Sequence, residues 1–289
     1  MRAFLALVAM MGCYFAAGPA SAEPEPYQVP ELCKPDAEGR TNHQACFDAS
    51  DPNSPSWLLA AINLGSEAFW KGDIETAAHF YDLCDASGKQ TFSDIGLHAN
   101  RAAVYRKIGR LDDSLRDARY AWQLAQENKF DMFGNPLSER ARFYALMYIV
   151  ETFHDANAPE FEPVVRAFLA TPARDEMDLE NQAGILTEIG RYDDALKVST
   201  ELLASFPDHA NMQNNHCYLL TLMGRAADGL PFCENAVAKE PDIAPYRHSY
   251  ATALAALGRC EDAEAALAVA RQLEPSVVIY REPLVCAAP

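Results

Sequence analysis

The chain has 289 residues, of which 49% are hydrophobic and 22% charged, the composition of an ordinary globular protein rather than of a disordered or fibrous one. Its formal net charge is −17, with 24 basic against 41 acidic residues. Such a surface repels phosphate backbones and anionic lipid headgroups, which excludes nucleic acid and membrane surfaces as preferred partners.

The first 22 residues have the three parts of a secretory signal peptide. Arg2 supplies the positive start, residues 3–17 form a short apolar core, and Ala20-Ser21-Ala22 matches the small-residue cleavage site. The apolar run is too short to span a bilayer comfortably, and no other stretch is long and apolar enough. We therefore expect cleavage after Ala22 and export, with the periplasm as the compartment. In an alternative interpretation, Cys13 is lipidated after a lipoprotein-type cleavage.

Residues 23–56 are rich in Pro, Asp and Asn, which favour turns. We expect a short irregular N-terminal extension here, closed by a disulfide between Cys33 and Cys46. These cysteines could alternatively ligate a metal together with His43. The spacing lacks the paired C-x-x-C of a zinc site, and an exported location favours the disulfide, so no metal is predicted.

A short pattern recurs along the rest of the chain. The stretch EIGRYDDAL at residues 188–196 has two later counterparts, and in all three a glycine and a following proline keep a spacing of 34 residues. These residues are Gly190, Gly224 and Gly258, then Pro207, Pro241 and Pro275. Gly72 and Gly109 carry the same signal earlier, 37 residues apart. Two features locked to one period indicate a repeat array.

The residue types in the repeat predict pairs of antiparallel helices. Helical patterns lie on both sides of each glycine, and glycine ends a helix at low cost because it adopts the left-handed conformation. Acidic residues follow in the first turn of the second helix, where they favour the positive end of its dipole. The proline ends that second helix. Each pair can bury its apolar stripe only against its neighbours, so stacked pairs form a continuous core.

These units resemble tetratricopeptide repeats. That family favours an apolar–small pattern in the first helix, a turn glycine, small residues in the second helix and a terminal proline. The last unit shows it as Ala251, Leu254, Gly258, Ala263 and Pro275. The resemblance implies an all-α, right-handed superhelical solenoid of antiparallel helix pairs. We place two units in residues 57–128, a divergent helical pair with an insertion in 129–175, three units in 176–277, and a C-terminal tail in 278–289.

Two segments depart from the pattern. Residues 137–172 lack the turn glycine, and HDANAPEFEP within them is expected to form a longer loop. The tail lacks the polar capping helix with which such arrays often end. We expect it to lie against the last hairpin, with its Val and Tyr side chains covering apolar surface.

The resemblance also implies a binding site, because in this family the first helix of each unit lines a concave face on which extended peptides bind. One position of that helix is asparagine in four of five units: Asn63, Asn100, Asn181 and Asn215. An amide both donates and accepts, so the row could hydrogen-bond a peptide backbone; alternatively, it holds the neighbouring unit. Further candidates for this face are Arg106, Lys107, Asn211, Asn214, Tyr218 and His248.

The remaining cysteines and an aromatic cluster are given structural roles. Cys217 and Cys233 lie in the two helices of one unit at positions that should face each other, and Cys260 with Cys286 could fasten the tail. Cys84 is then the odd, buried thiol. The aromatic cluster is expected in the core and in end packing; it comprises Phe69, Trp70, Phe80 and Tyr81.

No motif in the sequence predicts catalysis. A Walker-type loop, G-x-S-x-G and H-E-x-x-H are all absent, and the seven histidines are scattered, so neither a catalytic site nor a cofactor is expected. We predict an exported scaffold that binds an extended segment of another protein. One alternative is a structural subunit of an envelope complex, docked by its convex face or its ends. The least supported is an enzyme with a site in the loop around residues 155–163.

Overall fold

The structure, a computed structural model, describes residues 29–52, 54–87, 95–127 and 138–287. Throughout these ranges the regular elements are helices, with no strand. The predicted signal peptide and Cys13 lie outside the described residues. None of the helices in the described ranges has the length and apolar character needed to cross a bilayer.

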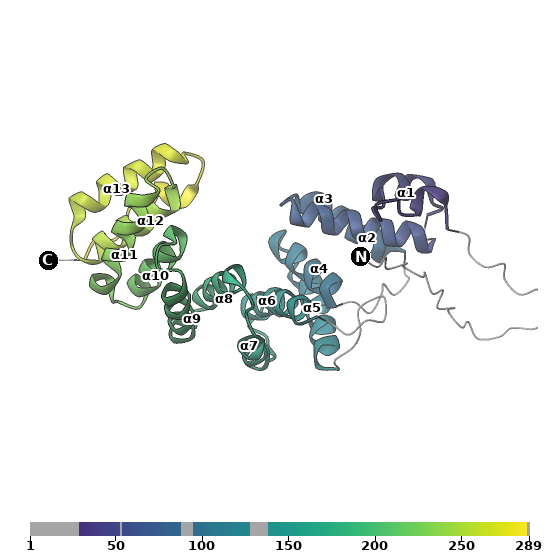
Figure 1. The fold of residues 1–289 in the computed structure, drawn as a ribbon, viewed down its shortest axis with the longest axis horizontal. Coiled ribbons are helices and arrows are strands. Elements are labelled where there is room, and N and C mark those ends of the chain that lie inside the picture. Colours follow the sequence, from purple (N-terminus) through teal and green to yellow (C-terminus); the bar gives the residue numbers. More distant parts are fainter. Residues whose placement is uncertain (1–28, 53, 88–94, 128–137, 288–289) are drawn as a thin grey trace, which may run out of the picture.

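Six consecutive helix pairs are described, and they stack into an elongated solenoid with α1 and α13 at opposite ends (Figure 1). The pairs are α2 (Pro55–Trp70) with α3 (Ile74–Ala86), α4 (Ile95–Lys107) with α5 (Leu111–Gln126), α6 (Glu139–Asp155) with α7 (Phe161–Ala170), α8 (Glu176–Glu188) with α9 (Tyr192–Ser205), α10 (Ala210–Leu222) with α11 (Ala226–Lys239), and α12 (Ala244–Ala256) with α13 (Cys260–Leu273). This is the predicted all-α solenoid of helix pairs.

Gly190 shows how the two helices of a pair are joined. Its φ is +74°, its N–H donates to the Thr187 carbonyl at 3.1 Å, and the Arg191 N–H donates to the Leu186 carbonyl at 2.8 Å. These bonds satisfy carbonyls that the helix end would otherwise leave without a partner. The same positive φ and the same bonds recur at Gly72, Gly109, Gly224 and Gly258. The prediction that glycine ends each first helix is confirmed at these positions.

Asn157 replaces the glycine between α6 and α7. Its φ is +49°, its N–H donates to the His154 carbonyl at 2.9 Å, and the Ala158 N–H donates to the Phe153 carbonyl at 2.9 Å. Asparagine tolerates the left-handed conformation better than most other side chains. The predicted longer loop is therefore a five-residue turn, 156–160, with the same bonds as the glycine turns.

The N-terminal extension is less irregular than predicted, because it contains helix α1 (His43–Ala49) after a 3-10 turn, η1 (Glu31–Cys33). The side chain of Asn42 caps α1 by accepting from the Ala45 N–H at 3.0 Å. The Phe47 ring stacks on the Trp57 ring of α2 with centroids 5.0 Å apart. This local cap and this aromatic contact favour a helix in a Pro- and Asp-rich segment, and α1 covers the first end of the solenoid.

At the other end the tail begins an incomplete further unit, ending in the 3-10 turn η2 (Val278–Arg281). Pro275 and Arg281 stand 34 residues after Pro241 and Arg247, and in both places the arginine Nε donates to the proline carbonyl at 3.0 Å. Tyr280 is 6% exposed and packs against the last helix pair. The repeat period therefore continues into the tail for one turn and covers the second end of the solenoid.

Only part of the tail covers apolar surface. Val277 and Leu284 pack against the α12–α13 core, whereas Val278 and Val285 are 66% and 94% exposed. The expectation that the tail's valines cover apolar surface is therefore wrong for these two residues. Only one turn of helix forms here, so it can turn few side chains toward the preceding pair.

Candidate functional site

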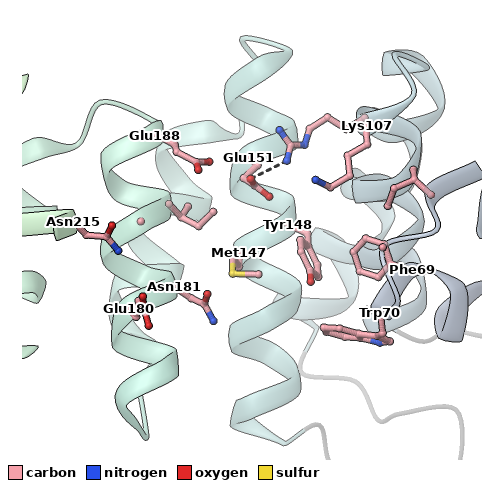
Figure 2. A pocket seen from close by; sticks show the side chains of 15 residues that line it. Phe69, Trp70, Lys107, Met147, Tyr148, Glu151, Glu180, Asn181, Glu188 and Asn215 are labelled. Atoms are coloured by element: carbon pink, nitrogen blue, oxygen red, sulfur yellow. Dashed lines mark ion pairs between the residues drawn. The ribbon is translucent and has the colours of Figure 1, made fainter. Parts of the chain in front are cut away.

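A groove of about 600 Å³ opens on the face formed by the first helices of the pairs. It runs from α2 and α4 across α6 to α8 and α10 (Figure 2). The backbone of α8 makes few close contacts with α6 and with α10, and this wide spacing leaves room between their side chains. Four of the residues predicted for the concave face line the groove: Arg106, Lys107, Asn181 and Asn215.

The predicted aromatic cluster divides between the core and this groove. Tyr81 and Phe69 are buried, and Phe80 is partly buried against the N-terminal core. Trp70, in contrast, is 62% exposed, and both Phe69 and Trp70 line the groove. The prediction that Trp70 is a core or end-packing residue is wrong, because neighbouring positions on a helix point about 100° apart and Phe69 takes the inward direction.

Trp70 is held in place by other rings. Its centroid lies 5.5 Å from that of Phe69 and 6.4 Å from that of Tyr144, both edge to face. Phe69 in turn meets Tyr148 on α6 with centroids 5.4 Å apart. An indole that is fixed at its edges and exposed on the groove is the kind of surface that anchors a ligand side chain.

The upper part of the groove holds a shared ion pair. The Arg106 guanidinium contacts the Glu151 carboxylate at 2.8 Å and the Asp155 carboxylate at 2.9 Å. Glu151 is only 12% exposed, and burial, together with the charge of Glu188, raises its pKa, although Arg106 opposes the shift. One guanidinium therefore serves two carboxylates.

Lys107 reaches into the groove from the α4 side and points toward Glu151 (Figure 2). The Lys107 side chain is exposed, and within the described ranges it makes no hydrogen bond and no ion pair. Its ammonium group is available to a ligand.

Helix α8 forms the opposite wall with one continuous face. Asn181, Gly184 and Glu188 follow one another at spacings of three and four residues, and Glu180 stands four residues before Gly184, which places them on one side of the helix. Gly184 lies in the helix interior, and a Cβ added there would meet nothing within 4 Å. The fold therefore does not require glycine at this position, and its absent side chain leaves the α8 backbone open to the groove.

Asn215 reaches the same groove from α10 and is oriented by its neighbour. The Asn214 amide donates to the Asn215 side-chain oxygen at 3.1 Å. Asn214 itself is 5% exposed, and its own side-chain oxygen has no hydrogen-bond partner among the described residues. Asn211 donates to the Glu180 carboxylate. Asn211 and Asn214 therefore support the groove wall, while Asn215 and Asn181 line it.

The other predicted residues lie away from this groove. The Asn63 amide donates to the Leu59 carbonyl of its own helix at 2.8 Å. His248 is half-buried against the tail, with its ring centroid 5.2 Å from that of Tyr280. Asn100 and Tyr218 are half-buried and are not part of the lining. The structure thus brings together the second half of the asparagine row and separates it from the first.

Several groove residues of the divergent pair and of the α8 face are not predicted by the sequence pattern: Met147, Tyr148, Glu151, Gly184 and Glu188. For α8 a signal was present, because Gly184 and Glu188 share the helical spacing of the predicted Asn181. For α6 no turn glycine fixed the register of the unit, so the face of that helix could not be assigned.

The segment considered for catalysis offers little chemistry. The His154 Nδ1 lies 3.2 Å from the carboxylate of the adjacent Asp155, and both side chains are 41% exposed. The ring of His154 packs against Phe161. In the described part of the chain, no group of three or more His, Cys, Asp or Glu side chains is placed to hold a metal ion.

Six of the seven described cysteines lie in three pairs at disulfide distance, compatible with the predicted bonds. Their Cα atoms are 4.5 Å apart in Cys33–Cys46, 5.5 Å in Cys217–Cys233 and 5.8 Å in Cys260–Cys286. Among the described cysteines, Cys84 is unpaired and buried, and burial raises the pKa of its thiol to about 11. Cys84 is therefore protonated and unreactive at neutral pH.

Comparison with known proteins places this architecture among tetratricopeptide-repeat solenoids. No family model and no curated protein matches the chain. A tetratricopeptide repeat protein from Parabacteroides merdae superposes on 84% of this chain and 89% of its own, with a TM-score of 0.60 and 17% identity. MamA covers 68% of this chain and 98% of its own at 14% identity, with a TM-score of 0.41. YrrB, described as a TPR protein with an unusual peptide-binding site, covers 65% and 91% at 13% identity, with a TM-score of 0.41.

Proposed function

We propose that this protein is an exported scaffold that binds an extended segment of another polypeptide in the groove between α2 and α10. The fold is that of a tetratricopeptide-repeat solenoid, which supports a role in protein–protein interaction. The observation that carries the proposal is the α8 face, where Asn181 lies one turn from a glycine that the fold does not need.

Gly184 supports close approach of a ligand backbone. Glycine in a helix interior costs about 0.5–1 kcal/mol relative to alanine, and here no packing contact offsets that cost. A main chain passing over Gly184 would come within reach of the amides of Asn181 and Asn215, each of which can donate and accept. Two amides that can hydrogen-bond a ligand's backbone, next to a helix surface without a side chain, suit an extended peptide.

The test is crosslinked co-purification from the native cells with wild type and with the Asn181→Ala, Asn215→Ala double variant. We expect one partner to be lost in the double variant while helicity and melting temperature stay almost unchanged, because both side chains are partly exposed. Gly184→Leu is the second test, since a Cβ at this position meets nothing within 4 Å and a larger side chain would occupy the groove.

The matched control is Glu201→Gln, which alters an exposed residue of α9 outside the groove. It should retain the partner. If the asparagine double variant and Gly184→Leu both retain the partner, groove binding is wrong and the interface lies elsewhere on the protein. Equal loss of fold and binding would show that the asparagines only hold neighbouring units together.

Two features support export to an oxidising compartment such as the periplasm. The N-terminal sequence has the parts of a signal peptide, although it lies outside the described residues. Three cysteine pairs lie at disulfide distance, and disulfides persist in oxidising compartments. Mass spectrometry of the protein from its native cells would test this, with the expected N-terminus at Glu23.

A second candidate function is docking of the C-terminal end in an envelope complex. Val278, Ile279 and Val285 are 66%, 50% and 94% exposed at that end. Under this alternative, Val278→Ser with Ile279→Ser would abolish association, whereas the groove variants would be silent.

A further inference from the structure

We propose that the groove selects a segment in which a basic side chain lies close to an aromatic or large apolar one. The basic residue would sit between Glu151 and Glu188, and the apolar residue would cover Trp70. This inference rests on the proposed function, since it names the ligand chemistry of the same groove.

The carboxylates that line the groove outnumber the cations available to them. Glu151 shares Arg106 with Asp155, so that guanidinium is already committed. Glu188 is exposed and has neither a hydrogen bond nor an ion pair within the described ranges. The upper groove therefore has negative charge that a Lys or Arg of the ligand can neutralise.

The interaction between Glu151 and Glu188 strengthens this assignment. Burial is the main cause of the raised pKa of Glu151, and the charge of Glu188 raises it further. A cation of the ligand placed between the two carboxylates would offset the repulsion between them. Glu180, lower on the same wall, has its pKa raised by burial and accepts a hydrogen bond from Asn211.

Lys107 marks the limit of the acidic region. It lies across the groove from the α8 wall (Figure 2), and its charge opposes the rise that burial causes in the pKa of Glu151. Of the two carboxylates, Glu151 and Glu188, Glu188 is the one that has no ion pair among the described residues. The Lys107 ammonium group would repel a ligand cation on that side and so direct it toward Glu188. The groove is therefore polarised across its width, and this polarity fixes which way a charged segment can lie.

Trp70 supplies the apolar half of the site. Its ring is exposed on the groove, and Phe69 and Tyr144 hold it from two sides, so ordering it on binding costs little entropy. The formal net charge of −17 also favours encounter with a basic segment over an acidic one.

The experiment selects dodecapeptides from a random phage-displayed library on the purified full chain with its disulfides formed. The consensus peptide is then titrated by fluorescence anisotropy, beside a version in which its basic residue is glutamine. We expect a basic residue and an aromatic or aliphatic one in the consensus. We expect about tenfold weaker binding for the glutamine peptide, for Glu188→Gln and for Trp70→Ala.

A double-mutant cycle gives the decisive measurement. Glu188→Gln and the glutamine peptide together should weaken binding hardly more than either alone, because both remove one contact. Glu201→Gln is the matched control and should leave binding unchanged. An acidic consensus, or fully additive losses in the cycle, would overturn the inference.

The two proposals fail in different ways. If the selected peptides show no preference for a basic residue but bind the Gly184→Leu variant more weakly, groove binding is supported and the proposed ligand chemistry is wrong. If the peptides bind the Gly184→Leu variant as tightly as wild type, or if no peptide is enriched, both groove binding and this inference are wrong.

Discussion

The C-terminal pairs α8–α13 and the N-terminal pairs α2–α7 build the same solenoid in two ways. The C-terminal pairs keep the 34-residue period, and in one of them Gly229 lies against the Cys217 carbonyl. The N-terminal pairs have irregular spacing and bury a charged network of His98, Arg101 and Asp117. The groove lies where the two halves meet.

The largest expected effect breaks the N-terminal network. Arg101 is 2% exposed and contacts the carboxylates of Asp85 and Asp117. Arg101→Met should lower the free energy of unfolding by about 3–5 kcal/mol, because it leaves a buried carboxylate short of compensating charge. Urea denaturation followed by circular dichroism would measure the loss.

Arg119→Ala is the control for that experiment. Arg119 pairs with Glu160 at 3.0 Å on the surface, with its side chain 52% exposed, so its removal should cost less than about 1 kcal/mol. Equal losses for Arg101→Met and Arg119→Ala would contradict the view that buried charge holds the N-terminal half together.

The same contrast explains what the sequence could reveal. The turn glycines were predictable because only a left-handed residue ends a helix so tightly, and Gly190 repeats that signal at a fixed period. Asn157 also ends a helix in the left-handed conformation, but no asparagine recurs at the repeat period. The sequence therefore could not show which residues of α6 correspond to those of the other first helices. Trp70 was misplaced because composition does not say which of two adjacent aromatic residues points inward. The His98–Asp117 pair joins two helices, and no spacing along the chain predicts it.

The next largest effect is expected from removing a disulfide of the C-terminal half. The Cys260–Cys286 pair closes a separation of 26 residues, and loss of such a bridge costs about 3 kcal/mol in the chain-entropy account. Cys260→Ser with Cys286→Ser should raise amide hydrogen exchange in α12 and α13, where the tail packs, and leave α4–α6 unchanged. Faster exchange along the whole chain would show that the halves unfold as one unit.

Two glycines in helix interiors of the C-terminal pairs differ in their packing. At Gly229 an added Cβ would lie 2.9 Å from the Cys217 carbonyl oxygen and 3.1 Å from the Leu220 Cβ, so Gly229→Ala should destabilise the protein by about 1–3 kcal/mol. At Gly184 an added Cβ meets nothing, so Gly184→Ala should stabilise it by about 0.5–1 kcal/mol. Thermal unfolding of both variants would test this, and effects of the same sign would contradict the difference in packing.

The smallest expected effect is a difference in how pH changes the stability contributed by one buried group in each half. Burial, helped by the charge of Arg225, lowers the pKa of His216, whose Nδ1 lies 2.9 Å from the Ser199 hydroxyl. The unfolded chain therefore takes up this proton first, and the contribution of His216 is complete above its ordinary pKa of 6.5 and falls as the pH drops below it.

Asp117 has the same sign in a lower window. Burial acts to raise the pKa of Asp117, but the hydrogen bond from His98 and the charge of Arg101 outweigh burial and lower it. Its contribution is present above the ordinary value of 3.8 and is lost as the pH falls further. Each group can change stability by at most about 1.4 kcal/mol per pH unit. In urea denaturation at several pH values, His216→Gln should flatten only the upper window and Asp117→Asn only the lower. If either variant removed the pH dependence of stability in both windows, the idea that different groups stabilise the two halves would be wrong.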